Sequence, residues 1–281
     1  MKIVVANCVL SLFLTCLLIG CNTGTKKKSD NNIQFDSLTV SKMYHFFQVD
    51  TNPQCTLQID FVYPVGYENG EVLKMIQQQF VSGFFGSEFV AFAPDKASEK
   101  YVEVFFNSLK DYEKDFKLDV ENHGSEVEEA WYTIEETMSN QIVYNRNDII
   151  SFEAEKTGYY GGAHGSHNYN NMSLDLKTGL QITEDKIFIN DYQEDLAKII
   201  VDAIALTNNV EIAELENIGF FNVNEIYPNK NFYVDETGIT YTFNEYEIAA
   251  YVVGPVKVHI PYEKIWHLLQ KTSPIAEIAF Q

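Results

Sequence analysis

Apolar and polar residues alternate strictly from Cys55 to Tyr63, and this period of two predicts a strand. A second apolar run, 43–49, precedes it, and the turn-forming residues 50–53 separate the two runs. We therefore expect a hairpin whose second strand buries one face. That face carries Cys55, Leu57, Ile59, Phe61 and Tyr63. The alternation indicates that Cys55 is a buried structural residue rather than a nucleophile.

The hydrophobic period becomes helical after Asn69. This residue is a suitable N-cap for a helix over 71–85, and Pro94 opens a second helix over 96–116. The apolar face of the first helix carries Leu73, Ile76, Phe80 and Phe84. The second helix has a stripe at spacings of four and three, formed by Tyr101, Phe105, Leu109, Tyr112 and Phe116. A stripe with this spacing is typical of a helix that faces a core.

The rest of the chain returns mostly to the strand period. We expect strands over 130–138, 141–144, 149–156, 169–176, 232–234, 239–243 and 256–260. Asn190 with Gln193 is expected to cap a helix over 191–205, and a last helix is expected over 263–269. The buried face of the helix over 191–205 should be Leu196, Ile199, Ile200, Ala203 and Ile204. Hairpins with inserted helices predict an α+β fold with mainly antiparallel sheets. We expect one α+β module over 37–180 and a second over 181–272.

The first residues indicate where the protein works. A basic start at Lys2, an apolar run over 3–18 and the motif Leu18-Ile19-Gly20-Cys21 resemble a bacterial lipoprotein signal. The run is too short for a transmembrane helix, which needs about 20 apolar residues. The resemblance implies cleavage of 1–20 and acyl chains on Cys21, which would attach the protein to a membrane. The alternative is an ordinary cleaved signal in which Cys21 is incidental.

This signal places the expected protein in the cell envelope, on the periplasmic side or the cell surface, and in the outer membrane if the cell is Gram-negative. The polar segment 21–36 is predicted to be a flexible tether. After cleavage Cys55 is the one thiol without lipid, so no intrachain disulfide framework is expected.

The formal net charge is -20 at pH 7. Such a field repels phosphate polymers and attracts cations, so nucleic acid is excluded as a partner. The sequence has no Gly-rich phosphate loop, Walker motif or dinucleotide fingerprint, and no cofactor is expected. The acidity alone is also consistent with simple solubility of an exported protein.

Four segments together carry a recognisable pattern. They are Tyr159-Tyr160-Gly161-Gly162-Ala163-His164, Ser173-Leu174-Asp175-Leu176-Lys177-Thr178-Gly179, 232–241 and 246–262. In this order they resemble the paired extracytoplasmic modules known as domains of unknown function 4163 and 3298. Such modules occur beside a peptidoglycan deacetylase domain and in the outer segment of a lysozyme-sensing anti-sigma factor. The sequence shows no deacetylase motifs, transmembrane helix or cytoplasmic head, so the resemblance implies a binding role and no catalytic residues.

The Gly-rich segment is the candidate ligand-contact loop. Its residues are Tyr159, Tyr160, Gly161, Gly162, His164, His167 and Tyr169. Tyrosines combine a stacking ring with a hydroxyl, which suits sugar and protein interfaces. The alternative is structural: the glycines form a turn, and His164 bonds the loop to a neighbouring strand. A metal bound by His164 and His167, completed by Asp175 or Glu155, is not expected, because a glycine-rich loop gives no fixed ligand spacing.

The acidic positions Glu126, Glu128, Glu129, Glu135 and Glu136 are expected to form a solvated face, although such carboxylates could also pair for glycoside chemistry. We assign no catalytic residue. The leading hypothesis is a non-enzymatic envelope protein that binds a cationic protein such as lysozyme or a peptidoglycan fragment. The alternatives are an envelope glycan hydrolase, a deacetylase-associated accessory protein, and a structural lipoprotein of an envelope assembly.

Overall fold

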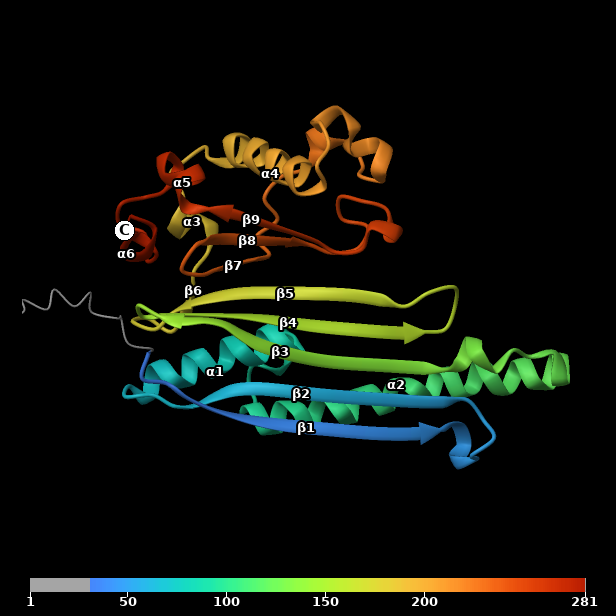
Figure 1. Cartoon of the computed structure of the whole chain (residues 1–281). Helices are drawn as coiled ribbons and strands as arrows, with labels where there is room; N and C mark the ends of the chain where they lie inside the picture. The colour runs from blue at the N-terminus through green and yellow to red at the C-terminus, as the bar shows by residue number, and fades with distance from the viewer. Residues whose placement is uncertain (1–30, 281) are drawn as a thin grey trace, which may run out of the picture.

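The computed structural model describes residues 31–280, and they form an α+β fold with two sheets (Figure 1). The first sheet has six strands in sequence order. They are β1 (Gln34–His45), β2 (Gln54–Gly66), β3 (Ile134–Arg146), β4 (Ile149–Tyr160), β5 (Ser166–Asp175) and β6 (Leu180–Gln181). All neighbouring strands are antiparallel except β2 and β3, which run parallel. The predicted α+β class with mainly antiparallel sheets is confirmed.

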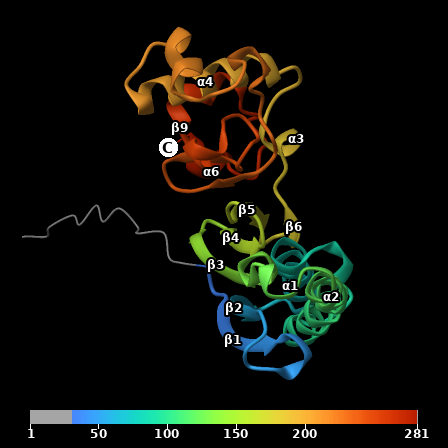
Figure 2. The same ribbon diagram turned by 90° about the vertical axis from the view of Figure 1, so that its right-hand side faces the viewer.

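Two helices form the crossover between β2 and β3. They are α1 (Gly70–Phe85) and α2 (Pro94–His123), and both lie on the same face of the first sheet (Figure 2). A parallel strand pair requires such a long connection, because the chain must return to the end of the sheet at which the first strand began. Asn69 caps α1 as predicted, since its side chain accepts hydrogen bonds from the backbone nitrogens of Glu71 and Val72.

The core of this part lies between the sheet and the helices. Of the predicted strand face, Cys55, Leu57, Ile59 and Phe61 are fully buried, and Tyr63 is half-buried against the same core. Aromatic rings fill the space: Phe61 stacks on Phe84 with centroids 4.4 Å apart, and Phe80 stacks on Phe152 at 4.3 Å. The stripe on α2 packs into the same core, with Phe105, Leu109 and Phe116 buried and Tyr101 and Tyr112 half-buried.

A second, three-stranded antiparallel sheet follows. Its strands are β7 (Phe232–Val234), β8 (Gly238–Phe243) and β9 (Val256–Pro261). Helix α4 (Gln193–Asn208) packs on it and buries Leu196, Ile200 and Ile204 in a separate apolar core. The short helices α3 (Glu184–Ile187), α5 (Tyr262–Ile265) and α6 (Ala276–Ala279) belong to the same part. This part contacts β4 and β5, far from β1 (Figure 1).

Directional polar bonds join the two parts. The Ser151 hydroxyl donates to the carbonyl oxygen of Val234 at 2.6 Å, and the Val234 nitrogen donates to the Ser173 hydroxyl at 2.9 Å. The Asn171 side chain donates to the Thr242 hydroxyl at 2.7 Å. The relative position of the two sheets is therefore set by specific hydrogen bonds as well as by apolar contact.

Several element boundaries differ from the sequence prediction. Strand β1 begins at Gln34, inside the segment expected to be tether, and β3 is one strand rather than two. Helix α2 continues to His123, well beyond 116. The expected cap of α4 is wrong: Tyr192 occupies the N-cap position and makes no side-chain capping bond. The last predicted helix is only the four-residue α5 followed by a 3-10 turn.

No helix within residues 31–280 is both long and apolar enough to cross a membrane. Cys21, with the predicted lipid attachment, lies outside the described residues. Cys55 is buried, and burial raises the pKa of its thiol to about 12. This environment agrees with the predicted structural role of Cys55, because the reactive thiolate is suppressed.

Candidate functional site

The candidate loop connects β4 to β5 and lies beside the 3-10 turn Glu129–Tyr132. Gly161 and Gly162 have φ angles of +81° and +93°, a region that favours glycine. At Gly161 a Cβ atom would lie 2.1 Å from the carbonyl oxygen of Trp131. The first glycine thus lets the loop pass directly against the backbone of Trp131.

The two histidines of the loop contact the connection between β8 and β9. His164 stacks on Tyr251 with ring centroids 3.8 Å apart. The Tyr246 hydroxyl oxygen lies 3.3 Å from the Nε2 atom of His164. The Nδ1 atom of His167 lies 2.9 Å from a carboxylate oxygen of Glu245. The two histidines therefore contact different residues of that connection. Through these contacts the loop joins the first sheet to the second part.

The tyrosine hydroxyls of the loop donate hydrogen bonds to other groups of the same chain. Tyr159 donates to the carbonyl oxygen of Gly162 at 2.9 Å. Tyr169 donates to Glu155 at 2.8 Å, and burial together with this carboxylate raises the pKa of Tyr169 to about 12. Tyr160 donates to Glu136. These contacts support the structural alternative for the loop, in which it clamps neighbouring segments.

Glu136 does not belong to a solvated face, contrary to the prediction. Its side chain is 2% exposed and pairs with Lys156, whose ammonium nitrogen lies 2.8 Å from a carboxylate oxygen. Tyr101 of α2 and Tyr160 of β4 both donate to the same carboxylate. Burial and the Glu136 charge raise the pKa of Tyr101 far above its ordinary value. The prediction failed because α2, distant in sequence, covers this position.

The other predicted acidic positions, Glu126, Glu128, Glu129 and Glu135, are exposed. Two of them line an open cavity of about 590 Å³ at the end of α2. We call this cavity the Trp131 groove; it is lined by Tyr112, Asp115, Asp119, His123, Glu126, Val127, Glu128, Trp131 and Tyr132. Among these described residues are four carboxylates and neither lysine nor arginine.

Hydrogen bonds hold the aromatic residues of the Trp131 groove in place. The Trp131 indole nitrogen donates to Glu128 at 2.8 Å, although the residue is 62% exposed. The Tyr132 hydroxyl donates to Asp119 at 2.5 Å, and this bond is the main cause that raises the pKa of Tyr132 to about 12. The Tyr132 ring packs edge-on against Phe116 of the core. The groove therefore offers an ordered aromatic surface surrounded by negative charge.

Such a surface suits cationic side chains. A Lys or Arg group gains both a carboxylate partner and the electron-rich face of an indole or phenol ring. The groove is also next to the candidate loop, because Gly161 packs on Trp131 and Tyr159 donates to the Ala130 carbonyl oxygen at 3.3 Å. The loop predicted from sequence thus supports the Trp131 groove, and its own hydroxyls are bonded within the chain.

Sequence reasoning missed this groove, although a signal was present. Tyr112, Asp115, Asp119 and His123 follow one another at spacings of three, four and four, which places them on one face of a helix. The predicted helix ended at 116, so the stripe was cut in half. Only the longer α2 brings Asp119 and His123 beside Trp131.

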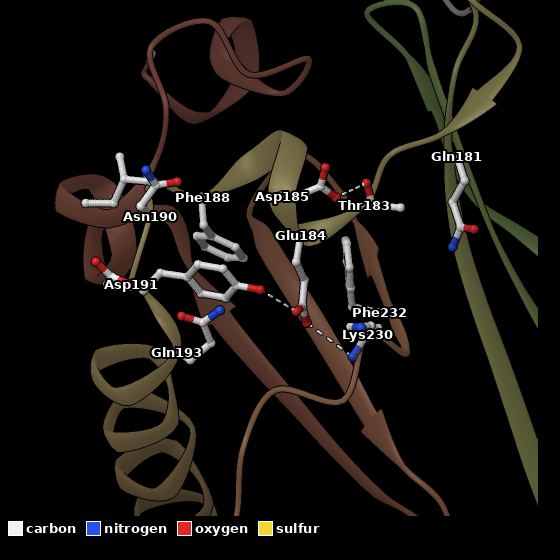
Figure 3. A pocket seen from close by; sticks show the side chains of 12 residues that line it. Gln181, Thr183, Glu184, Asp185, Phe188, Asn190, Asp191, Gln193, Lys230 and Phe232 are labelled. Carbon is white, nitrogen blue, oxygen red and sulfur yellow. Dashed lines mark hydrogen bonds between the residues drawn. The ribbon is translucent and has the colours of Figure 1, made fainter.

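A larger cavity, about 700 Å³, lies between β6 and the start of α4 (Figure 3). Its buried carboxylate is Glu184, which accepts hydrogen bonds from the Tyr192 hydroxyl at 2.6 Å and the Tyr241 hydroxyl at 3.0 Å. The backbone nitrogen of Lys230 is a third donor, at 3.1 Å. Because all three bonds come from the protein itself, this carboxylate organises the second core and is already satisfied.

His164 and His167 contact different residues, Tyr251 and Glu245. Within residues 31–280, no group of three or more His, Cys, Asp or Glu side chains is placed to hold a metal ion. The two carboxylates that could complete such a site are bonded elsewhere: Glu155 accepts from the Tyr169 hydroxyl at 2.8 Å, and Asp175 accepts from the backbone nitrogen of Lys177 at 2.8 Å.

Two family models match separate parts of this chain. Residues 185–263 match the family model described as protein of unknown function DUF3298, and residues 51–167 match the model described as deacetylase PdaC. The expected resemblance to the 3298 module is thereby confirmed. No curated protein matches the chain.

Solved structures similar to this chain include two DUF3298 family proteins. A DUF3298 family member from Bacteroides fragilis has a TM-score of 0.83 at 28% identity, covering 90% of this chain and 99% of that one. A DUF3298 family protein from Pseudomonas aeruginosa has a TM-score of 0.58 at 12% identity, covering 86% of this chain and 97% of that one. The second similarity shows a shared fold alone.

Proposed function

We propose that this chain is a lipid-anchored, extracytoplasmic protein of the bacterial envelope that binds a cationic protein of the lysozyme class in the Trp131 groove. The observation that carries the proposal is the combination of four carboxylates with an exposed, hydrogen-bonded tryptophan in one cavity. The proposed role is binding without catalysis.

The anchor rests on the lipobox-like motif that ends at Cys21. Several acyl chains would make attachment effectively permanent, because each buried methylene contributes about 0.8 kcal/mol. The matches to a DUF3298 model and to a model described as a deacetylase support an accessory role in the envelope. The resemblance to the outer segment of a lysozyme-sensing anti-sigma factor supports lysozyme as the class of ligand.

The charge of the groove favours a cationic protein over a peptidoglycan fragment. Stem peptides of peptidoglycan carry carboxylates, which Asp115, Asp119, Glu126 and Glu128 would repel. A cationic protein gains from the same groups and from the overall charge of -20, which speeds encounter at low ionic strength. We therefore propose that the ligand is a cationic protein. Muropeptides serve as the alternative ligand in the test.

Isothermal titration of the full chain in mild detergent tests this proposal. Lysozyme and a purified muropeptide are titrated separately at low salt, and the lysozyme titration is repeated at about 0.15 M salt. We expect lysozyme to bind, with affinity falling as salt rises, and the muropeptide not to bind. Lysozyme with acetylated lysines is the matched control, because acetylation removes positive charge and keeps the fold. Absence of lysozyme binding at low salt, or equal binding of the acetylated form, would refute the proposal.

A further inference from the structure

Strand β1 is a long, open edge of the first sheet. It has 12 residues and is hydrogen-bonded on one side to β2. In the sheet order of the described residues no strand lies beyond it, whereas the opposite edge is the two-residue β6. Both ribbon views place β1 at the end of the molecule farthest from the second part (Figure 1 and Figure 2). Its outer backbone groups are therefore available to another strand, apart from the Ser37 nitrogen, which donates to the Asp36 carboxylate at 2.8 Å.

The sequence of β1 contains little that would prevent such pairing. Natural edge strands are protected by proline, bulges or several inward charges. The central stretch 36–45 pairs with β2 without a bulge and contains no proline or glycine. Its full charges are Asp36 and Lys42, and Met43 is 63% exposed.

The positions of these charges make β1 complementary to itself. Asp36 and Lys42 each lie three residues from Thr39. In an antiparallel pair of two identical strands with the twofold axis at Thr39, Asp36 of one copy stands opposite Lys42 of the other, and this happens twice. The same register places Leu38 opposite Val40, which are both half-buried at the core face. Directly opposite residues of antiparallel strands are the pairs that interact most strongly.

Other registers lose this match. With the axis at Val40, Lys42 would face Leu38, and with the axis at Leu38, Asp36 would face Val40. An axis at Asp36 or at Lys42 would bring like charges together. Only the register centred on Thr39 joins the opposite charges.

We propose that two copies of this chain form a symmetric dimer through β1, which continues the six-stranded sheet across a twofold axis at Thr39. The occupant of the open edge is thus a second copy. This inference does not depend on the Trp131 groove, which lies on α2 and the turn after it. Attachment of both copies to one membrane would favour the pairing by raising their local concentration.

Cysteine cross-linking tests the register in the full chain. Thr39→Cys should form an intermolecular disulfide under mild oxidation, because directly opposed Cα atoms lie about 4.5–5.5 Å apart. Ser41→Cys alone should not, because the two copies of residue 41 would be about 14 Å apart. A mixture of Ser37→Cys and Ser41→Cys proteins should cross-link, since these positions face each other. The unmodified chain with its buried Cys55 gives the background.

Charge exchange tests the same contact without cysteine chemistry. Asp36→Lys should convert the dimer to monomer in sedimentation analysis, since the introduced ammonium group would face Lys42 of the partner copy; the double variant Asp36→Lys/Lys42→Asp should restore the dimer. Glu216→Lys, an equal charge change at an exposed position in the turn Ile212–Ile218, is the matched control and should stay dimeric. A monomeric unmodified chain, a cross-link from Ser41→Cys alone, or a dimer unaffected by Asp36→Lys would overturn the proposal.

Discussion

The ammonium nitrogen of Lys257 on β9 lies 2.8 and 2.7 Å from the two carboxylate oxygens of Glu153 on β4, so one ion pair joins the two sheets. The Glu153 side chain is 7% exposed, whereas that of Lys257 is 40% exposed. The Lys257 ammonium also lies 4.2 Å from the centroid of the Tyr169 ring. Loss of the Lys257 ammonium group would therefore weaken the contact between the two sheets.

Lys257→Ala should therefore destabilise the protein. Removing one partner of a buried pair leaves an uncompensated carboxylate and costs about 3–5 kcal/mol, and partial exposure of Lys257 lowers the expected loss to roughly 2 kcal/mol. Chemical denaturation measures the change. Lys96→Ala, which removes the exposed partner of Glu99, is the control and should leave the midpoint unchanged. Equal effects of the two variants would show that the inter-sheet pair is unimportant.

Gly161→Ala should destabilise the protein more than Gly162→Ala. Both positions have positive φ, which costs about 1–2 kcal/mol for a residue with a Cβ. At Gly161 the added atom would also meet the Trp131 carbonyl oxygen, whereas at Gly162 nothing lies within 4 Å. Denaturation midpoints give the comparison, and Trp131 fluorescence reports whether the groove has moved. An equal loss at the two glycines would contradict the close approach.

Glu136→Gln should cost about 1–3 kcal/mol, because the buried site holds a carboxylate with two tyrosine donors and Lys156. The adjacent Glu135 is exposed, so Glu135→Gln should change stability by less than about 0.5 kcal/mol. The two variants remove the same charge one residue apart. If both behave alike in thermal and chemical unfolding, Glu136 is solvated and the described network is wrong.

Stability should fall as the pH rises from about 10 to about 12. Hydrogen bonds to carboxylates and burial raise the pKa values of Tyr44, Tyr132 and Tyr169 from 10.0 to about 12. In this window the folded state holds phenol protons that the unfolded state has released, so the stabilisation is complete below pH 10 and is lost at higher pH.

Denaturation curves at several pH values, with tyrosinate absorbance as a second signal, measure this loss. Tyr132→Phe removes one of the contributing groups, so its stability should depend less steeply on pH in the same window. Tyr227→Phe, at an exposed position, is the matched control and should keep the slope of the unmodified chain. A slope that Tyr132→Phe leaves unchanged would contradict the Tyr132–Asp119 bond.

Local patterns explain why much of the fold was predictable. The buried face of β2 and the cap of α1 depend on residues that are neighbours in sequence, and both were predicted correctly. The parallel pairing of β2 with β3 depends on a crossover of two helices, and no short-range period records it. The cap of α4 failed although Asn190 and Gln193 have suitable side chains, because the helix starts after Tyr192 instead.

The candidate site was predictable only in part, for the same physical reason. The glycine-rich loop was recognised, but its contacts with Trp131 and Tyr251 join segments about 30 and 90 residues away in the chain. The burial of Glu136 requires Tyr101 to arrive from α2. Acidic composition alone predicts solvated carboxylates, and only the packing of α2 separates Glu136 from Glu135.

The affinity of the full chain for lysozyme, measured by titration for a groove variant and a matched control, tests the central claim most directly. Asp115→Asn/Glu126→Gln removes two charges of the Trp131 groove, and Asp202→Asn/Glu216→Gln removes two exposed charges elsewhere. We predict that the groove variant, and Trp131→Ala with it, binds more than about tenfold more weakly, while the control keeps the affinity of the unmodified chain. Equal affinities for the groove variant and the control would contradict binding in the Trp131 groove.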